Sequence, residues 1–374
     1  RMTGALDDAE ASCERALAGN PRDCQAHYLR SDLRRQTPAS NHIAEMETLL
    51  ATNTLAWRAE VLLRFALAKE QEDIGAYPQS FAHLKAGADL HRRHIRYDVR
   101  DDIAVIDEII RTHSAQAVQA AAPGHRGAAP VFIVGLPRTG TTLVERIVAS
   151  HSAALSLGEL TEFGFLLTRA AGDAAGRQDL VRKSLTLDMA MLGRAYVERT
   201  QPIEAGQAAR FIDKMPQNYL YCGLIHAALP EAKIILLHRR PLDACYAVYK
   251  AHFSGAYPFS FDLGDLGEYY LAYRRLVAHW KSVLPPACLF EIAYEDIVAD
   301  LAGAARRILD FLDLPWEEGV SRFHESTAPS TTASAVQVRR PVYATSIGKW
   351  KAYARELAPL RARLAQGLEA EELE

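Results

Sequence analysis

A glycine-bounded turn rich in hydroxyl residues follows an apolar run in the middle of the chain. Residues 131–142 read VFIVGLPRTGTT, which predicts a strand, a tight turn and a helix that starts near Thr141. Such a turn directs backbone N–H groups and the positive end of a helix toward a phosphate. The spacing is nearly that of a Walker A loop, but Thr141 stands where the lysine belongs. We predict a phosphate loop, rather than a merely structural turn, formed by Arg138, Thr139, Gly140, Thr141 and Thr142.

Basic residues end two further apolar segments. Arg239 and Arg240 follow residues 233–238, and Lys214 follows residues 211–213. The carboxyl ends of parallel strands meet at one edge of a sheet, so these cations are expected near the phosphate loop. Arginine binds phosphate with two parallel hydrogen bonds. The alternatives are a surface arginine pair and a solvated lysine.

Three other polar positions complete the candidate site. Glu159 ends a short strand-like segment, LSLGE, and can accept a proton as a general base; a helix cap, or Glu162 as the base, are the alternatives. Tyr294 follows another strand, at 288–292, and is either a ligand contact or a core residue. A polar, non-periodic stretch suits a loop over a ligand. It contains Ser334, Gln337, Arg340, Pro341 and Lys349.

The elements that position these residues alternate between strand and helix. Strand patterns at 131–134, 211–212, 233–237 and 288–292 are separated by helical patterns, which predicts an α/β domain with a parallel sheet covered on both faces.

An all-α region is expected before this domain, because the first 110 or so residues have helical spacing throughout. Phe65–Leu90 resembles a whole tetratricopeptide repeat, with Gly75 at its turn and Ser80, Phe81 and Leu84 on its packing face. Ala5–Pro21 resembles the second helix of another repeat, which predicts more repeats upstream; a generic helical bundle is the alternative. With Ala115–Pro130 as a linker, we predict a truncated repeat region at 1–125 and an α/β domain at 126–374.

Composition excludes several classes. The net charge of −3 argues against a nucleic-acid partner, and no apolar run reaches 18 residues, so no membrane span is expected. Five scattered cysteines without a CxxC motif predict reduced thiols and a cytoplasmic location. No carboxylate cluster accompanies the loop, so no metal is required.

Between about Pro130 and Leu360, these ordered motifs resemble sulfotransferases that use 3'-phosphoadenosine-5'-phosphosulfate (PAPS). The likeness is greatest to protein-tyrosine sulfotransferases and to sulfotransferases fused to tetratricopeptide repeats. It implies a P-loop kinase-like fold and release of 3',5'-adenosine diphosphate (PAP). It also implies that residues 138–142 bind the 5'-phosphosulfate and that Arg239 binds the 3'-phosphate. The family has a serine eight residues after that arginine, whereas this chain has Ala247.

The resemblance also implies catalytic roles. Glu159 would be the base, Lys214 would contact the bridging oxygen, and Ser334 would help to stabilise the transition state. Arg340 and Lys349 would hold the cofactor and Tyr294 would contact the adenine.

The tyrosine-sulfating members carry arginines after the glutamate, but here that stretch reads LTEFG. The acceptor, a hydroxyl or an amine on a small molecule, glycan or peptide, therefore stays open, as does a protein partner of the repeats. Two rival functions remain: an ATP-dependent phosphotransferase, which the missing Walker lysine disfavours, and a non-catalytic repeat scaffold with a degenerate nucleotide fold.

Overall fold

A computed structural model describes residues 5–120, 124–127, 129–200, 210–325 and 342–374. The chain forms two compact units. The first comprises Arg1–Val99, Pro241–Tyr269 and Thr345–Glu374, and the second comprises Arg100–Arg240 and Tyr270–Ala344. These units group residues that pack together and are discontinuous in sequence, whereas the predicted domain boundary between residues 125 and 126 divides the sequence at a single point. That boundary stays a prediction.

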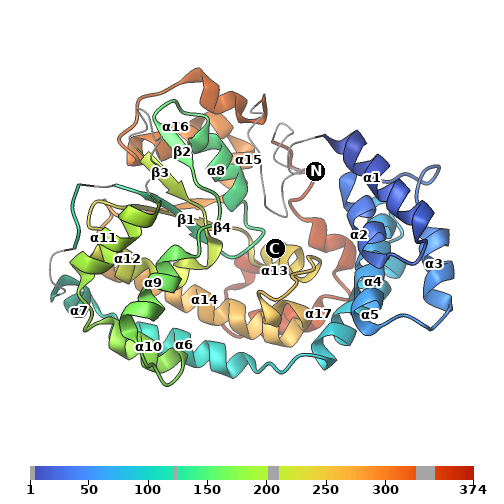
Figure 1. The fold of residues 1–374 in the computed structure, drawn as a ribbon, viewed down its shortest axis with the longest axis horizontal. Coiled ribbons are helices and arrows are strands. Elements are labelled where there is room, and N and C mark those ends of the chain that lie inside the picture. Colours follow the sequence, from blue (N-terminus) through green and yellow to red (C-terminus); the bar gives the residue numbers. More distant parts are fainter. Residues whose placement is uncertain (1–4, 121–123, 128, 201–209, 326–341) are drawn as a thin grey trace. The chain divides into compact units, whose positions relative to one another are not determined.

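The second unit is built on a parallel sheet of five strands (Figure 1). Its strand order is β2-β3-β1-β4-β5, and every neighbouring pair is parallel. The strands are β1 (Val131–Gly135), β2 (Ala154–Ser156), β3 (Arg210–Asp213), β4 (Lys233–His238) and β5 (Leu289–Ala293). The predicted α/β class is confirmed, and β1 lies in the middle of the sheet.

Both faces of the sheet are covered, which explains why β1 is apolar throughout and wholly buried. On one face, Ile133 belongs to a core shared with α8 (Thr141–Ala149) and α16 (Leu301–Phe311). On the other face, Phe132 packs against Phe163 and Tyr196, with ring centroids 6.1 and 5.4 Å away. These two rings come from α9 (Glu162–Ala171) and α11 (Met189–Thr200).

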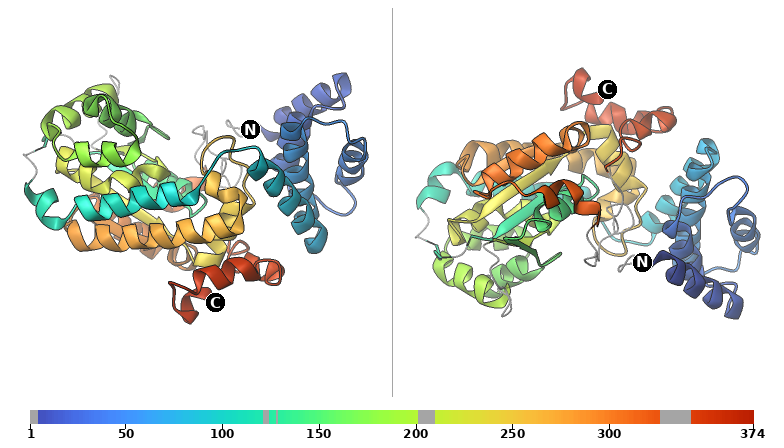
Figure 2. Two further views of the ribbon diagram at one scale, coloured as in Figure 1. Left: turned by 90° about the horizontal axis from the view of Figure 1, so that it is seen from below. Right: turned by 90° about the horizontal axis from the view of Figure 1, so that it is seen from above.

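Two long helices run side by side in this unit (Figures 1 and 2). Asp107 of α6 (Val99–Thr112) accepts a hydrogen bond of 2.8 Å from Arg275 of α14 (Leu263–Val283), and His279 contacts the carbonyl of His113 at 2.9 Å. Further helices of this unit are α10 (Arg177–Ser184), α12 (Cys222–Ala228), α15 (Tyr294–Ala299) and the 3₁₀ helices η1 (Pro216–Tyr221) and η3 (Glu318–Glu325).

The linker prediction for Ala115–Pro130 is wrong at its start, because Ala115–Ala120 forms the short helix α7. Alanine has the highest helix propensity of all residues, and Val118 gives this turn one buried anchor. The absence of periodicity over so few residues therefore did not exclude a helix.

Helices dominate the first unit, as predicted. They are α1 (Leu6–Gly19), α2 (Cys24–Leu33), α3 (Ile43–Ala51), α4 (Trp57–Asp73) and α5 (Tyr77–Arg93). The predicted turn at Gly75 joins α4 to α5, and its φ of 83° is a left-handed conformation that glycine adopts freely. Ser80, Phe81 and Leu84 are buried, as expected of a packing face. The repeat identity of these helices stays a prediction.

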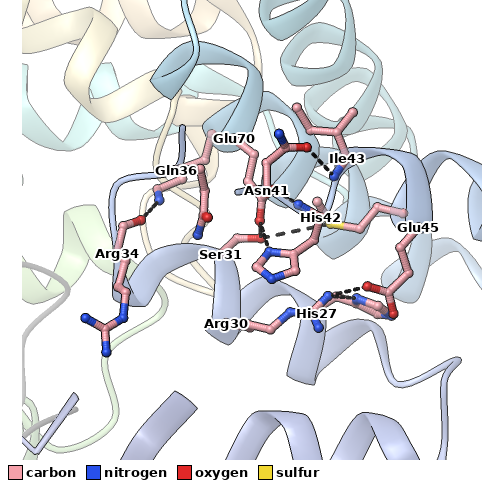
Figure 3. A network of polar contacts seen from close by, with 12 residues as sticks. His27, Arg30, Ser31, Arg34, Gln36, Asn41, His42, Ile43, Glu45 and Glu70 are labelled. Carbon is pink, nitrogen blue, oxygen red and sulfur yellow. Dashed lines mark hydrogen bonds and ion pairs between the residues drawn. The ribbon is translucent and has the colours of Figure 1, made fainter. Parts of the chain in front are cut away.

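A buried carboxylate ties α2, α3 and α4 together (Figure 3). Glu70 is fully buried and accepts hydrogen bonds from the Ser31 hydroxyl at 2.6 Å and from the His42 backbone N–H at 2.7 Å. Its other contact, to Nδ1 of His42, is 3.0 Å long. Burial alone would raise the pKa of Glu70, but the bonds from His42 and Ser31 lower it below its ordinary value.

Two later segments complete the first unit. Residues 241–269 supply α13 (Pro241–Tyr249) and η2 (Pro258–Phe261), and residues 345–374 supply η5 (Lys349–Tyr353), α17 (Ala358–Leu364) and η6 (Ala370–Leu373). In the described part of the chain, no helix is long and apolar enough to cross a membrane.

Candidate functional site

The predicted phosphate loop lies between β1 and α8, where the strand pattern and the helix start placed it. Gly140 has a φ of 108° and Arg138 a φ of 68°, so the turn passes twice through the left-handed region. The hydroxyl of Thr139 donates to the carbonyl of Leu136 at 2.7 Å. Thr139, Thr141 and Thr142 are all buried at the start of a nine-residue helix. The loop therefore has the positive-φ backbone and the helix start that a phosphate loop requires, and its binding of a phosphate stays a prediction.

Close packing around the loop leaves room only for glycine at two positions. A Cβ on Gly135 would lie 2.4 Å from the carbonyl oxygen of Leu237, which belongs to the neighbouring strand β4. A Cβ on Gly140 would lie 2.7 Å from Cδ2 of Tyr294. The two glycines thus fit the loop against β4 and against the start of α15.

Arg239 and Tyr294 lie together at this sheet edge. The Arg239 guanidinium sits over the Tyr294 ring, 4.9 Å from its centroid, and only 8% of Arg239 is exposed. The strand ends of β1, β4 and β5 therefore bring Gly140, Arg239 and Tyr294 into one cluster. Tyr294 is half-buried, so it is not an ordinary core tyrosine.

Arg240 differs from its neighbour. It is exposed, and its backbone N–H donates to the Glu295 carboxylate at 3.0 Å. The cation buried at the strand end is therefore Arg239, and its contact with a 3'-phosphate stays a prediction.

Glu159 and Lys214 are in direct contact, which the sequence did not predict. Ser156 of β2 is in register with Ile212 of β3, and beyond these strands the Lys214 backbone N–H donates to the Gly158 carbonyl at 2.9 Å. The parallel register thus carries both side chains to the same edge, where the Lys214 ammonium donates to the Glu159 carboxylate. Glu159 precedes α9 by three residues and shares its carboxylate with Lys214, so the helix-cap alternative is not supported.

A second carboxylate beside Lys214 was missed. Glu145 lies on α8, with an oxygen 3.7 Å from the Lys214 ammonium, and it accepts a hydrogen bond of 2.6 Å from Ser156. Lys214 is fully buried between Glu145 and the half-exposed Glu159. Glu145 therefore connects the lysine to the helix that carries the phosphate loop. A glutamate within the apolar helix TTLVERIVA was the signal that could have revealed it.

Asp213, next to Lys214, also went unnoticed. Its carboxylate is buried and accepts hydrogen bonds from the Tyr196 hydroxyl at 2.8 Å, from Asn218 at 3.2 Å and from the Leu160 backbone N–H at 3.4 Å. Burial raises the pKa of Asp213 to about 7, although these hydrogen bonds lower it. The group therefore titrates near neutrality and fixes the backbone on either side of Glu159 and Lys214.

Three predicted site residues lie outside the described residues of this unit. Ser334 and Arg340 lie outside the described residues, as do Gln337 and Pro341. Lys349 belongs to the first unit, where its ammonium donates to the Glu72 carboxylate. Its role in holding a cofactor stays a prediction. Ala247, where the family has a serine, is buried in α13 of the same unit.

The parallel sheet, the glycine loop before α8 and the basic strand ends define an α/β protein of the phosphate-loop class. The sequence pattern described as the sulfotransferase family matches residues 130–318. This match covers half of the sequence and all five strands. The chain therefore belongs to the sulfotransferase family.

The chain is similar to several individual proteins. An uncharacterized protein of Aquifex aeolicus is 30% identical over 97% of this chain, and the chain spans 49% of that protein's length. Protein-tyrosine sulfotransferase A of Caenorhabditis elegans is 25% identical over 65% of the chain and 67% of its own length. Among solved structures, the sulfotransferase domain of the Synechococcus PCC 7002 olefin synthase is 19% identical, with a TM-score of 0.45 over 66% of this chain and 98% of that domain.

Proposed function

We propose that the chain transfers a sulfuryl group from PAPS to a hydroxyl or amine acceptor by in-line displacement. The observation that carries the proposal is the contact between Glu159 and Lys214 at the sheet edge. There a base and a cation lie side by side, and Glu145 joins the cation to the phosphate-loop helix. A phosphate loop that lacks the Walker lysine, with a buried lysine supplied by another strand, supports a donor other than a nucleoside triphosphate.

The residues present fit this donor. The buried threonine hydroxyls and the backbone of residues 138–142 suit the 5'-phosphosulfate, and the α8 N-terminus adds positive potential. Arg239 suits the 3'-phosphate, and the half-exposed face of Tyr294 suits an adenine ring. By resemblance, Arg340 and Lys349 would add further cations to the donor site.

Each catalytic residue has one task. The donor supplies an activated sulfur, whose bond to the phosphate oxygen breaks as the acceptor's oxygen or nitrogen bonds to it. Glu159 takes the acceptor's proton, which makes the acceptor a better nucleophile. Lys214 hydrogen-bonds the phosphate oxygen that leaves, so that the charge developing there is stabilised by a buried ammonium. Ser334 would assist Lys214 by resemblance. The acceptor's proton, the transferred sulfuryl group and the charge on the leaving phosphate oxygen are all accounted for without a metal ion.

The acceptor side is less defined than the donor side. Residues 160–164 contain no arginine that would attract an acidic peptide, so an acidic peptide is not favoured over other acceptors. A small molecule, a glycan and a peptide all remain candidate acceptors. A cytoplasmic location and a protein partner of the repeat-like helices are further proposals.

Calorimetric titration of the full chain tests the donor. We expect PAP to bind at least tenfold more tightly than 5'-adenosine monophosphate, because charge-assisted contacts to a phosphate are worth ~1.5–3 kcal/mol. Arg239→Ala should remove most of this difference. Arg306→Ala is the matched control, since Arg306 also stacks on an aromatic ring, 4.1 Å from the centroid of Trp316.

Transfer of labelled sulfate to a panel of acceptors, with and without a chelator, tests the reaction. Turnover that survives chelation supports the proposal. Tighter binding of ATP than of PAP, with magnesium-dependent phosphate transfer, would establish the phosphotransferase instead. A chain that binds none of these nucleotides would be a scaffold.

A further inference from the structure

A cavity of about 540 Å³ lies within the first unit, formed by residues of that unit alone. Its walls come from α2, α4, the end of α5, residues 95–97 and residues 252–261. The volume falls within the range of small-molecule sites, about 300–1,000 Å³. None of the buried core residues around Met46 and Leu63 lines the cavity, although Tyr28 and Leu62 border both, so the cavity lies beside that core.

Aromatic rings line much of the cavity. They include Tyr28, Trp57, Tyr97 and Phe261, with the imidazoles of His91 and His252 among them. His91 stacks on Phe261 with ring centroids 3.8 Å apart, and it meets Trp57 edge-on at 5.7 Å. Rings held in place by one another form a preorganised surface for a flat ligand.

The charged groups of the lining are both positive. Arg58 and Arg96 are exposed, and no described carboxylate pairs with either side chain. The Arg58 guanidinium lies 4.3 Å from the centroid of the Trp57 ring. Burial lowers the pKa of His91, and it lowers the pKa of His252 to about 4, so both imidazoles are neutral at pH 7. The lining contains no acidic residue.

We propose that this cavity binds an aromatic group that carries a negative charge, with the ring among Trp57, His91 and Tyr97 and the anion at Arg58 and Arg96. The guanidinium groups supply charge-assisted hydrogen bonds, and the edges of the Trp57 and Tyr97 rings supply apolar contact. The Trp57 ring itself is already stacked on His94, with ring centroids 4.4 Å apart, and lies beneath the Arg58 guanidinium. This inference concerns a site of the first unit and does not depend on sulfuryl transfer. The aromatic anion is either a free small molecule or an aromatic side chain of a peptide.

The test uses the full chain and a pair of probes of the same shape. 2-Naphthoate and 2-naphthamide share a ring system, but only the first carries a charge at pH 7. We expect 2-naphthoate to quench tryptophan fluorescence and to bind at least tenfold more tightly than the amide, because one charge-assisted bond contributes about that factor. Trp57→Phe should remove most of the quenching, while Trp316→Phe should leave it intact.

The arginine variants locate the anion. Arg58→Ala and Arg96→Ala should each weaken 2-naphthoate binding about tenfold and leave 2-naphthamide unchanged. Arg93→Ala is the control, because Arg93 is exposed on the same stretch of chain but does not line the cavity. All three side chains are exposed, so the variants should keep the wild-type melting temperature.

A peptide with one sulfotyrosine flanked by glycines, compared with free 4-nitrophenyl sulfate, decides the source of the ligand. If the peptide binds more tightly than 4-nitrophenyl sulfate, the natural ligand is a side chain of a protein partner. If the two bind equally, the ligand is a small molecule. Both results support an aromatic-anion site. Equal binding of 2-naphthoate and 2-naphthamide, or binding that Arg58→Ala and Arg96→Ala do not change, would overturn the proposal.

Discussion

Glu159 is half-exposed while its partner Lys214 is fully buried, and this difference separates their two roles. An exposed carboxylate can meet an acceptor that arrives from solvent. A buried ammonium between two carboxylates, Glu145 and Glu159, is held in place and can only act on a group brought to it.

Glu159→Gln should therefore lower turnover without loosening the nucleotide. General-base catalysis contributes ~10²–10⁴-fold, so we expect a fall of that order in the single-turnover rate, with PAP affinity within a few-fold of wild type. Glu162→Gln, three residues away, is the matched comparison. Lys214→Ala should weaken both rate and PAP binding. An unchanged rate in the Glu159 variant would remove this residue from the mechanism, and a loss in Glu162→Gln alone would transfer the role.

Asp213 predicts an unusual pH dependence of stability. Its pKa is about 7 in the folded chain and ordinarily 3.8, so the folded chain holds an extra proton between these values. Stability from this group is fully present below pH 3.8 and is lost as the pH rises toward 7 and beyond. In urea unfolding from pH 4 to 8, Asp213→Asn should lack this decline.

Tyr196→Phe provides the control for that measurement. It removes one hydrogen bond to the Asp213 carboxylate and should extend the decline to higher pH, since that bond lowers the pKa of Asp213 in the folded chain. Identical pH profiles for wild type and Asp213→Asn would show that the carboxyl is not titrating near neutrality.

At the scale of elements, the sequence predicted the strands but not which side chains from different strands would be in contact. Residues 131–135 are apolar without interruption, as expected of a strand covered on both faces. Further strand-like runs alternate with helical patterns, so the parallel sheet could be predicted from the sequence. Glu159 and Lys214 were each predicted at a strand end. Their contact depends on the pairing of β2 with β3, and this register is a tertiary property. Glu145 was missed because one charge in an apolar helix does not reveal what it faces.

The phosphate loop gives a prediction about backbone geometry. Gly140→Ala would place a methyl group 2.7 Å from Tyr294 at a φ of 108°, so the loop must shift away from α15. We expect PAP affinity to fall tenfold or more. Gly172→Ala is the control, because Gly172 has a φ of 63° and open space around its Cβ position. It should lose about 1–3 kcal/mol of stability, because a φ of 63° with a ψ of −132° is strained for a residue with a Cβ, and it should retain PAP affinity.

At the scale of the whole molecule, the first unit draws together three distant stretches of sequence around one carboxylate. Glu72 of α4 accepts hydrogen bonds from Lys250 at 2.9 Å and from the Tyr353 hydroxyl at 3.2 Å, and it also contacts Tyr246 and Lys349. Residues 72 and 349 are separated by 277 positions. No local pattern predicts such a contact, which is why Lys349 was assigned from resemblance alone.

Glu72→Gln should make the chain less stable at neutral pH. Burial would raise the pKa of Glu72, but Lys250 and Lys349 lower it to about 2 from an ordinary 4.5. The associated stability, on the order of 3 kcal/mol, is present above pH 4.5 and is lost as the pH falls toward 2. Urea unfolding from pH 2 to 7 should show the difference between variant and wild type shrinking over that range.

Glu60→Gln, on the same helix, removes only a surface ion pair with Arg64 and should change stability by less than about 1 kcal/mol at every pH. A Glu72 variant that behaves like the Glu60 variant would mean that this carboxylate does not hold the three stretches together.

Residues 241–269 and 345–374 belong to the first unit, so the order in which the chain is translated affects how that unit folds. Helices α1 to α5 are translated before the residues that neutralise Glu72, which are Lys250 and Lys349. Until then the end of α4 carries a carboxylate without its ammonium partners, and Tyr77 and Phe81 of α5 lack the aromatic ring of Tyr353. Helices α1 to α5 therefore complete their packing only after residues 241–269 and 345–374 have been made, and a fragment cut at residue 125 would lack these partners.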